Sequence, residues 1–164
     1  MTDLTLTTER TINAPQKAVF DAWLDPKMLA RFMMPGPDMS VPVAKTDARV
    51  SGGFEIVMRA GDHDIPHHGT YKEINPHERL VFTWYGPSPA EDSTVTLTFD
   101  AVEGGTHVIL RHDRFINEQR RDDHKQGWTG ILISLDNLLA KVATQHAGAH
   151  APRSFRRALI AALV

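Results

Sequence analysis

The feature that most constrains this sequence is a change of hydrophobic period near residue 117. Before it, apolar and polar residues alternate in short segments separated by turn residues, a pattern typical of β-strands. After it, residues 117–146 carry one apolar stripe at helical spacing, formed by Trp128, Ile131, Leu132, Leu135, Leu138, Leu139 and Val142. Such a helix is about 40 Å long, because each residue adds about 1.5 Å. It is long enough to lie across a whole sheet.

Turn residues divide the chain before this helix into seven predicted strands. A first strand over residues 4–12 leads into two short helices, which begin near Asn13-Ala14-Pro15 and Asp25-Pro26. The remaining six are a short strand before Gly52-Gly53 and residues 54–59, 65–74, 80–85, 94–102 and 106–114. Strands joined by such short turns are antiparallel neighbours. The predicted class is therefore α+β, with a curved antiparallel sheet wrapped around the C-terminal helix.

The helix is expected to form one domain with the sheet. Asn117 is the predicted N-cap of this helix, with Glu118 in its first turn. The domain is assigned to residues 1–146. Residues 147–164, which contain Arg153, Arg156 and Arg157, are expected to form a mobile C-terminal tail, with a weak amphipathic helix as the alternative.

Composition and motifs remove several classes of function. A net charge of −2 gives no reason to expect nucleic acid or an anionic membrane as partner, and residues 158–164 are too short an apolar run to insert into a bilayer. The chain has no cysteine and no visible secretory signal, so a cytoplasmic location is expected. Neither glycine pair fits a phosphate-binding loop, and no G-x-S-x-G motif occurs, so no cofactor is predicted.

A cavity is expected between the sheet and the helix, because one helix cannot fill the inner surface of so many strands. Gly127 and Gly130 are expected to remove bulk from the helix face beside it. Trp84 and Trp128 suit a cavity wall, although a tryptophan can also simply fill the core. The predicted ligand-binding residues are Phe54, Met58, Tyr71, Phe82, Trp84, His112, Trp128 and Leu132.

His112 is the candidate catalytic residue. It alternates with Val108 and Leu110, so all three are expected to face the cavity, with Arg114 near its mouth. A histidine in an apolar pocket has a shifted pKa and can act as general acid or base, but it can equally be a core histidine that is hydrogen-bonded to a neighbour. Tyr71, Glu73 and His124 are further candidate polar groups.

The densest histidine group does not predict a metal site. His63 and His67 have the spacing of ligands on a helix, yet Pro66 and the preceding Gly61-Asp62 turn exclude a helix there. In a strand, His67 and His68 point to opposite faces. The expected structure is a polar hairpin with one histidine turned inward.

Several motifs in order resemble the homologue family of the heat-shock protein 90 ATPase activator, within the START-like (SRPBCC, Bet v-like) superfamily. They are Ile12-Asn13-Ala14-Pro15, Ala22-Trp23-Leu24-Asp25-Pro26, Gly69-Thr70-Tyr71-Lys72-Glu73-Ile74, Arg79-Leu80-Val81-Phe82-Thr83-Trp84, His124-Lys125-Gln126-Gly127-Trp128 and Leu135-Asp136-Asn137-Leu138. The resemblance covers roughly residues 4–143 and implies a helix-grip fold. The chain begins at the first strand, so we expect no counterpart of the activator's partner-binding N-terminal module.

Three functions follow as hypotheses. The first is binding of a small hydrophobic or aromatic molecule in the cavity. The second is a cyclase, dehydratase or hydrolase that uses His112 with a carboxylate. The third is stimulation of a chaperone ATPase through the outer surface. A homodimer formed by pairing of an exposed edge strand is also compatible with the sequence.

Overall fold

The computed structural model describes residues 4–87 and 93–148. Seven strands, two short helices and one long helix follow one another as β1 (Leu4–Ile12), α1 (Gln16–Ala22), α2 (Pro26–Phe32), β2 (Met39–Thr46), β3 (Gly53–Ala60), β4 (His63–Asn75), β5 (Arg79–Thr83), β6 (Thr94–Val102), β7 (Gly105–Phe115) and α3 (Glu118–Gly148). The predicted α+β class and the order of its elements are confirmed. The expected tail lies almost entirely outside the described residues.

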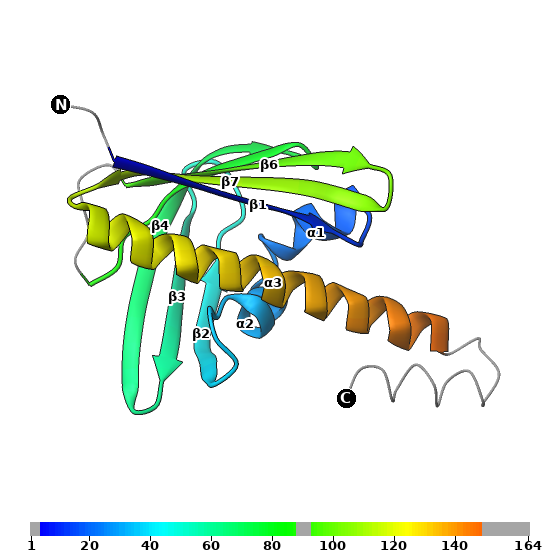
Figure 1. The fold of residues 1–164 in the computed structure, drawn as a ribbon, viewed down its shortest axis with the longest axis horizontal. Helices are drawn as coiled ribbons and strands as arrows, with labels where there is room; N and C mark the ends of the chain where they lie inside the picture. The colour runs from blue at the N-terminus through cyan, green and yellow to red at the C-terminus, as the bar shows by residue number, and fades with distance from the viewer. Residues whose placement is uncertain (1–3, 88–92, 149–164) are drawn as a thin grey trace.

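The strands form one antiparallel sheet in the order β1-β7-β6-β5-β4-β3-β2. Its curvature centres on β4, which is 13 residues long and pairs with a different neighbouring strand along each part of its length. Residues 63–70 pair with β3, and residues 71–75 pair with β5. Figure 1 shows the result: β2, β3 and β4 run steeply away from β1, β6 and β7, and α3 crosses between the two parts.

A β-bulge in β4 corrects one prediction. The register between β4 and β5 shifts between Tyr71 and Glu73. Tyr71 is therefore buried, whereas Glu73 lies at the surface and pairs with Arg79 at 3.0 Å. The expectation that Glu73 supplies a polar group to the cavity is wrong, because a bulge breaks the strict alternation on which it depended.

Helix α3 is attached to the edge strand β1 by polar contacts. The hydroxyls of Thr8 and Thr129 are 2.9 Å apart, and Arg10 Nε donates to Asp136 Oδ2 at 2.9 Å. The backbone N–H of Asn13 donates to the other oxygen of Asp136 at 3.3 Å. Asn13 thus contacts α3 and does not cap α1, whose N-cap position is Pro15.

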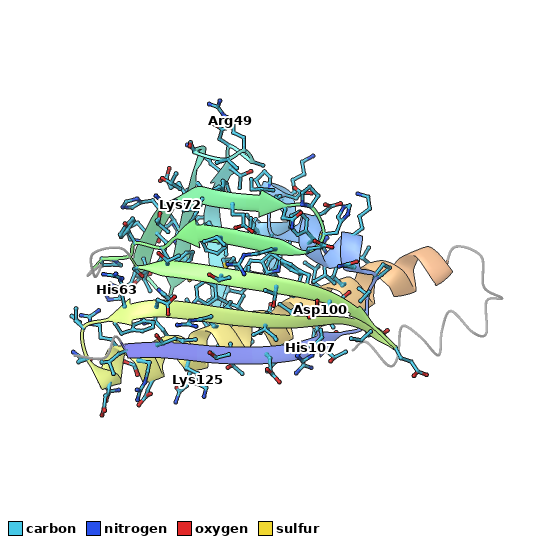
Figure 2. All side chains as sticks on the ribbon, turned by 90° about the horizontal axis from the view of Figure 1, so that it is seen from above. Arg49, His63, Lys72, Asp100, His107 and Lys125 are labelled. Atoms are coloured by element: carbon cyan, nitrogen blue, oxygen red, sulfur yellow. The ribbon has the colours of Figure 1, made fainter. Side chains whose placement is uncertain are left out.

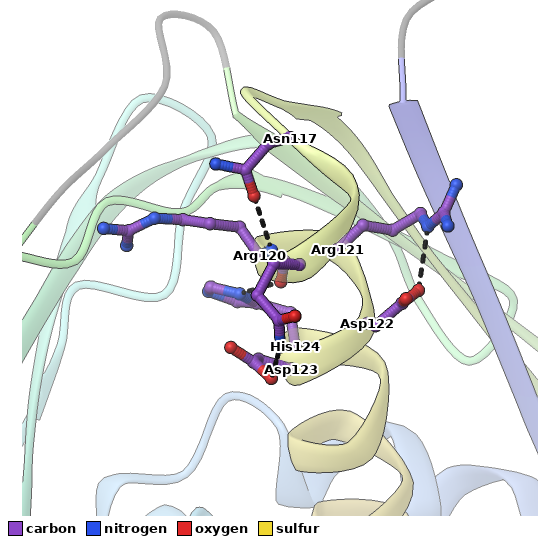
Figure 3. A network of polar contacts seen from close by, with 7 residues as sticks. Asn117, Arg120, Arg121, Asp122, Asp123 and His124 are labelled. Atoms are coloured by element: carbon purple, nitrogen blue, oxygen red, sulfur yellow. Dashed lines mark hydrogen bonds and ion pairs between the residues drawn. The ribbon is translucent and has the colours of Figure 1, made fainter.

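The predicted start signals of α2 and α3 are confirmed. Asp25 Oδ1 accepts from the backbone N–H of Lys27 at 2.9 Å, next to Pro26 in the first turn of α2. Asn117 Oδ1 accepts from the backbone N–H of Arg120 at 2.8 Å (Figure 3), which caps α3. These caps set where each helix leaves the sheet.

The two faces of the sheet differ as the alternation predicts. Val108 and Leu110 are fully buried on the inner face. Figure 2 looks onto the outer face, over which Lys72, Asp100 and His107 are spread. In the described part of the chain, no helix combines the length and apolarity needed to cross a bilayer.

Of the two glycines expected to remove bulk beside the cavity, Gly130 has a different role. A Cβ at Gly130 would lie 2.2 Å from the carbonyl oxygen of Pro35, so this glycine admits the backbone of the loop after α2. It does not leave a void. A Cβ at Gly127 would lie 3.9 Å from the Pro35 ring, which is ordinary van der Waals contact.

This difference gives a matched pair of variants on one helix. Gly130→Ala should lower the free energy of unfolding by about 1–3 kcal/mol, because the loop backbone must move. Gly127→Ala should raise it by up to about 1 kcal/mol, because alanine favours helix and nothing clashes. Urea unfolding of both variants measures this, and equal effects would contradict the proposed contact.

Candidate functional site

Two adjoining compartments lie between the sheet and the N-terminal half of α3. The first, here called the polar compartment, has a volume of about 280 Å³. It is lined by Ile65, His67, Trp84, Gly86, Pro87, Ser93, His112, Arg114, Phe115, Ile116, Arg120 and His124. The second, the apolar compartment, has a volume of about 210 Å³. It is lined by Pro35, Met39, Met58, Ile65, His67, Trp84, Asp123, His124, Gly127, Trp128 and Ile131.

Four residues belong to both linings: Ile65, His67, Trp84 and His124. The ring of His67 stacks on Trp84 with centroids 4.6 Å apart and an angle of 24°. The ring of Trp84 in turn lies 4.8 Å from that of Trp128. An aromatic wall therefore runs from β4 across the sheet to α3.

His112 sits at the inner end of the polar compartment in a chain of buried hydrogen bonds. Trp128 Nε1 donates to His112 Nδ1 at 3.0 Å, and His112 Nε2 lies 2.6 Å from Ser93 Oγ. Because an indole nitrogen can only donate, Nδ1 must carry a lone pair, and the proton of neutral His112 resides on Nε2. His112 therefore donates to Ser93. Both ring nitrogens are occupied.

Burial keeps the two inward histidines neutral. Desolvation, helped by the nearby His124, lowers the pKa of His112 to about 3. Desolvation, followed by the charge of His124, also lowers the pKa of His67 to about 4. Neither ring carries charge near pH 7.

His67 differs from His112 in its hydrogen bonding. Its side chain is 9% exposed, yet its Nδ1 atom is buried without a hydrogen-bond partner. The backbone of Ile65 lies near enough to oppose the lowering of the pKa, but its geometry falls short of a hydrogen bond to Nδ1. A buried polar atom without a hydrogen-bond partner lowers the stability of the fold, so the unpaired Nδ1 of His67 requires an explanation.

The structure brings only part of the predicted ligand-binding set together around the compartments. Met58, Trp84, His112 and Trp128 line one or both of them. Phe54, Tyr71 and Phe82 instead line a void of about 10 Å³ beside Trp84, with room for no more than about one water. Leu132 lies in the core at 1% exposure. The binding role of all eight residues stays a prediction.

Several lining residues were not predicted from sequence, above all His67, Ile65 and Arg120. A signal for His67 was present: it alternates with Gly69 and Tyr71, and all three are buried. His67 and His68 do point to opposite faces, and His68 packs beside Tyr85 at the surface. Within residues 4–87 and 93–148, no three His, Cys, Asp or Glu side chains are arranged to hold a metal ion.

The depressed pKa values predict acid sensitivity. In the unfolded chain these histidines titrate near about 6.5, so between pH 6.5 and 4 the unfolded state binds more protons than the folded state. Stability is therefore greatest above pH 6.5 and falls with acidification, by about 1.4 kcal/mol per pH unit for each histidine. Urea unfolding between pH 7.5 and 4.5 should show this slope. His112→Gln should reduce this slope, because it removes one of the two buried histidines.

Comparison with known proteins agrees with this architecture. A sequence model described as Activator of Hsp90 ATPase homolog 1-like protein matches residues 13–140. No curated protein matches the chain. The crystal structure of a protein from Chromobacterium violaceum is 26% identical, with a TM-score of 0.75 over 82% of this chain and 96% of the other.

Two further solved structures share the fold at lower identity. The AHSA1-like protein from Aeromonas hydrophila is 24% identical, with a TM-score of 0.74 over 85% of this chain and 94% of its own. A protein from Nitrosomonas europaea is 22% identical, with a TM-score of 0.73 over 85% and 96% of the two chains. The resemblance and the helix-grip fold inferred from sequence are thereby confirmed. The chain belongs to the family of Activator of Hsp90 ATPase homolog 1-like proteins, within the START-like superfamily.

Proposed function

We propose that this protein binds a small hydrophobic or aromatic molecule between its sheet and α3. The observation that carries the proposal is the pair of adjoining compartments of about 280 and 210 Å³ with a shared aromatic wall. Small-molecule sites are commonly clefts of this kind, lined mainly by apolar and aromatic side chains with a few polar groups. The size and lining of the two compartments therefore match a ligand site.

The lining determines what kind of molecule fits. Met39, Met58 and Ile131 offer apolar contacts, and Trp84 and Trp128 offer aromatic surface. Filling such a lining with apolar ligand atoms removes it from water, which contributes about 25 cal/mol for each Å² buried. A planar ring system can pack against the tryptophans while methionine side chains adjust around it. The site thus favours compact ring compounds over long flexible chains.

The two other hypotheses have less support. An enzyme acting through His112 would need a ring nitrogen open to substrate, and both are engaged by Trp128 and Ser93. Stimulation of a chaperone ATPase would need a contact surface, but the large exposed apolar side chains among the described residues come from separate segments: Val50, Val102, Ile116 and Ile133. No specific observation favours either hypothesis over binding in the cavity.

Filling the two compartments with a larger side chain tests the proposal. The neutral fluorescent probe N-phenyl-1-naphthylamine should bind the native protein saturably, with one site per chain. Ile65→Trp should weaken this binding at least about tenfold, because Ile65 lines both compartments and the added ring fills them. Fluorescence titration measures the dissociation constants.

Ile74→Trp is the matched control. Ile74 is on the same strand and also half-buried against the core, but it lines neither compartment. Its probe affinity should stay within about twofold of the native value. The proposal fails if the native protein gives no saturable signal, or if both tryptophan variants weaken binding equally.

A further inference from the structure

The two compartments differ in the charge of their linings. The lining of the polar compartment includes the guanidinium of Arg120, and no described residue of this lining carries a carboxylate. The rings of His67 and His112 in the same lining are neutral near pH 7. The apolar compartment has one acidic residue, Asp123, which is exposed and accepts a hydrogen bond from Gln119 at 2.9 Å (Figure 3). A molecule that spans both compartments therefore meets apolar surface at one end and a cationic group at the other.

His67 marks the boundary between these environments. Its Nδ1 atom is buried, has no partner, and belongs to a ring that lines both compartments. Such an atom is costly in the empty protein and is satisfied when a ligand supplies the complementary group. An oxygen acceptor suits Nδ1 when that nitrogen carries the proton.

Arg120 decides which oxygen group fits. It belongs to the first turns of α3, is half-buried, and lines the polar compartment. Figure 3 shows its side chain extending away from that of Arg121, which pairs with Asp122 at 3.0 Å. A guanidinium presents a planar set of donors that matches the two oxygens of a carboxylate.

We propose that the ligand is an aromatic carboxylate whose ring lies in the apolar compartment and whose carboxylate is held in the polar compartment by Arg120 and His67. This inference rests on the proposed function and specifies the class of ligand. It also gives the buried Nδ1 atom of His67 a role: it is left without a partner so that the ligand can provide one.

Two isosteric probes separate charge from shape. The native protein is titrated calorimetrically with 2-naphthoate and with 2-naphthamide, which have the same ring system but differ in charge. The carboxylate should bind about tenfold tighter or more, because a charge-assisted hydrogen bond is stronger than a neutral one. If the amide binds as tightly as the carboxylate, the inference is wrong and the proposed function stands. If neither binds and the neutral fluorescent probe also fails, both are wrong.

Neighbouring arginines supply the matched variants. Arg120→Gln should reduce the preference for 2-naphthoate to about threefold or less, whereas Arg121→Gln, with the same change in net charge, should keep it. Equal loss in both variants would indicate a general effect of protein charge and overturn the assignment of Arg120.

His67→Phe tests the second contact. The phenyl ring keeps a planar face against Trp84 but removes Nδ1. The unliganded variant should melt at the same or a higher temperature than the native protein, while its affinity for 2-naphthoate falls severalfold. A lower melting temperature with unchanged affinity would show that His67 has a structural role only.

Discussion

A buried hydrogen bond from Trp128 to His112 joins the C-terminal helix to the sheet. It connects α3 to β7, and through Ser93 it reaches the segment that enters β6. Its direction is determined by chemistry, since indole can only donate, and this direction fixes the tautomer of His112. Burial keeps that ring uncharged, which the geometry requires, because an imidazolium would direct a second N–H at the indole N–H. The inner end of the cavity is thus formed by a rigid and neutral group.

The cavity exists because α3 follows one edge of the sheet. Contacts to Thr8 and Arg10 hold the helix along β1, while β4 bends and carries β2 and β3 away from it (Figure 1). The loop after α2 approaches α3 where Gly130 permits contact with Pro35, and this closes one end of the space. Towards the N-terminus of α3 no element covers the bend in the described structure. The two compartments lie there.

The division of the cavity into a polar and an apolar part also follows from this arrangement. Met39 of β2, Met58 of β3 and Ile65 of β4 line the apolar part opposite Trp128, whereas the end of β7 and the first turns of α3 contribute Arg114, Arg120 and His124. His67 stands where these sets meet. Of the two buried histidines in the lining, His112 is hydrogen-bonded at both ring nitrogens, whereas His67 Nδ1 has no partner. We therefore assign a structural role to His112 and propose ligand recognition for His67.

The sequence by itself determined the fold and the facing of most side chains. The two-residue period, the caps at Asp25 and Asn117, and the helical stripe each depend on neighbours within a few residues, and local backbone geometry suffices to read them. The same reasoning placed His112 on the inner face beside Val108 and Leu110. It failed at Glu73, because a bulge is one extra residue that a period cannot reveal. Only the tertiary structure decided the site. His67, Trp84, His112 and His124 meet through the bend of β4 and the path of α3 along β1, and packing between distant segments sets both.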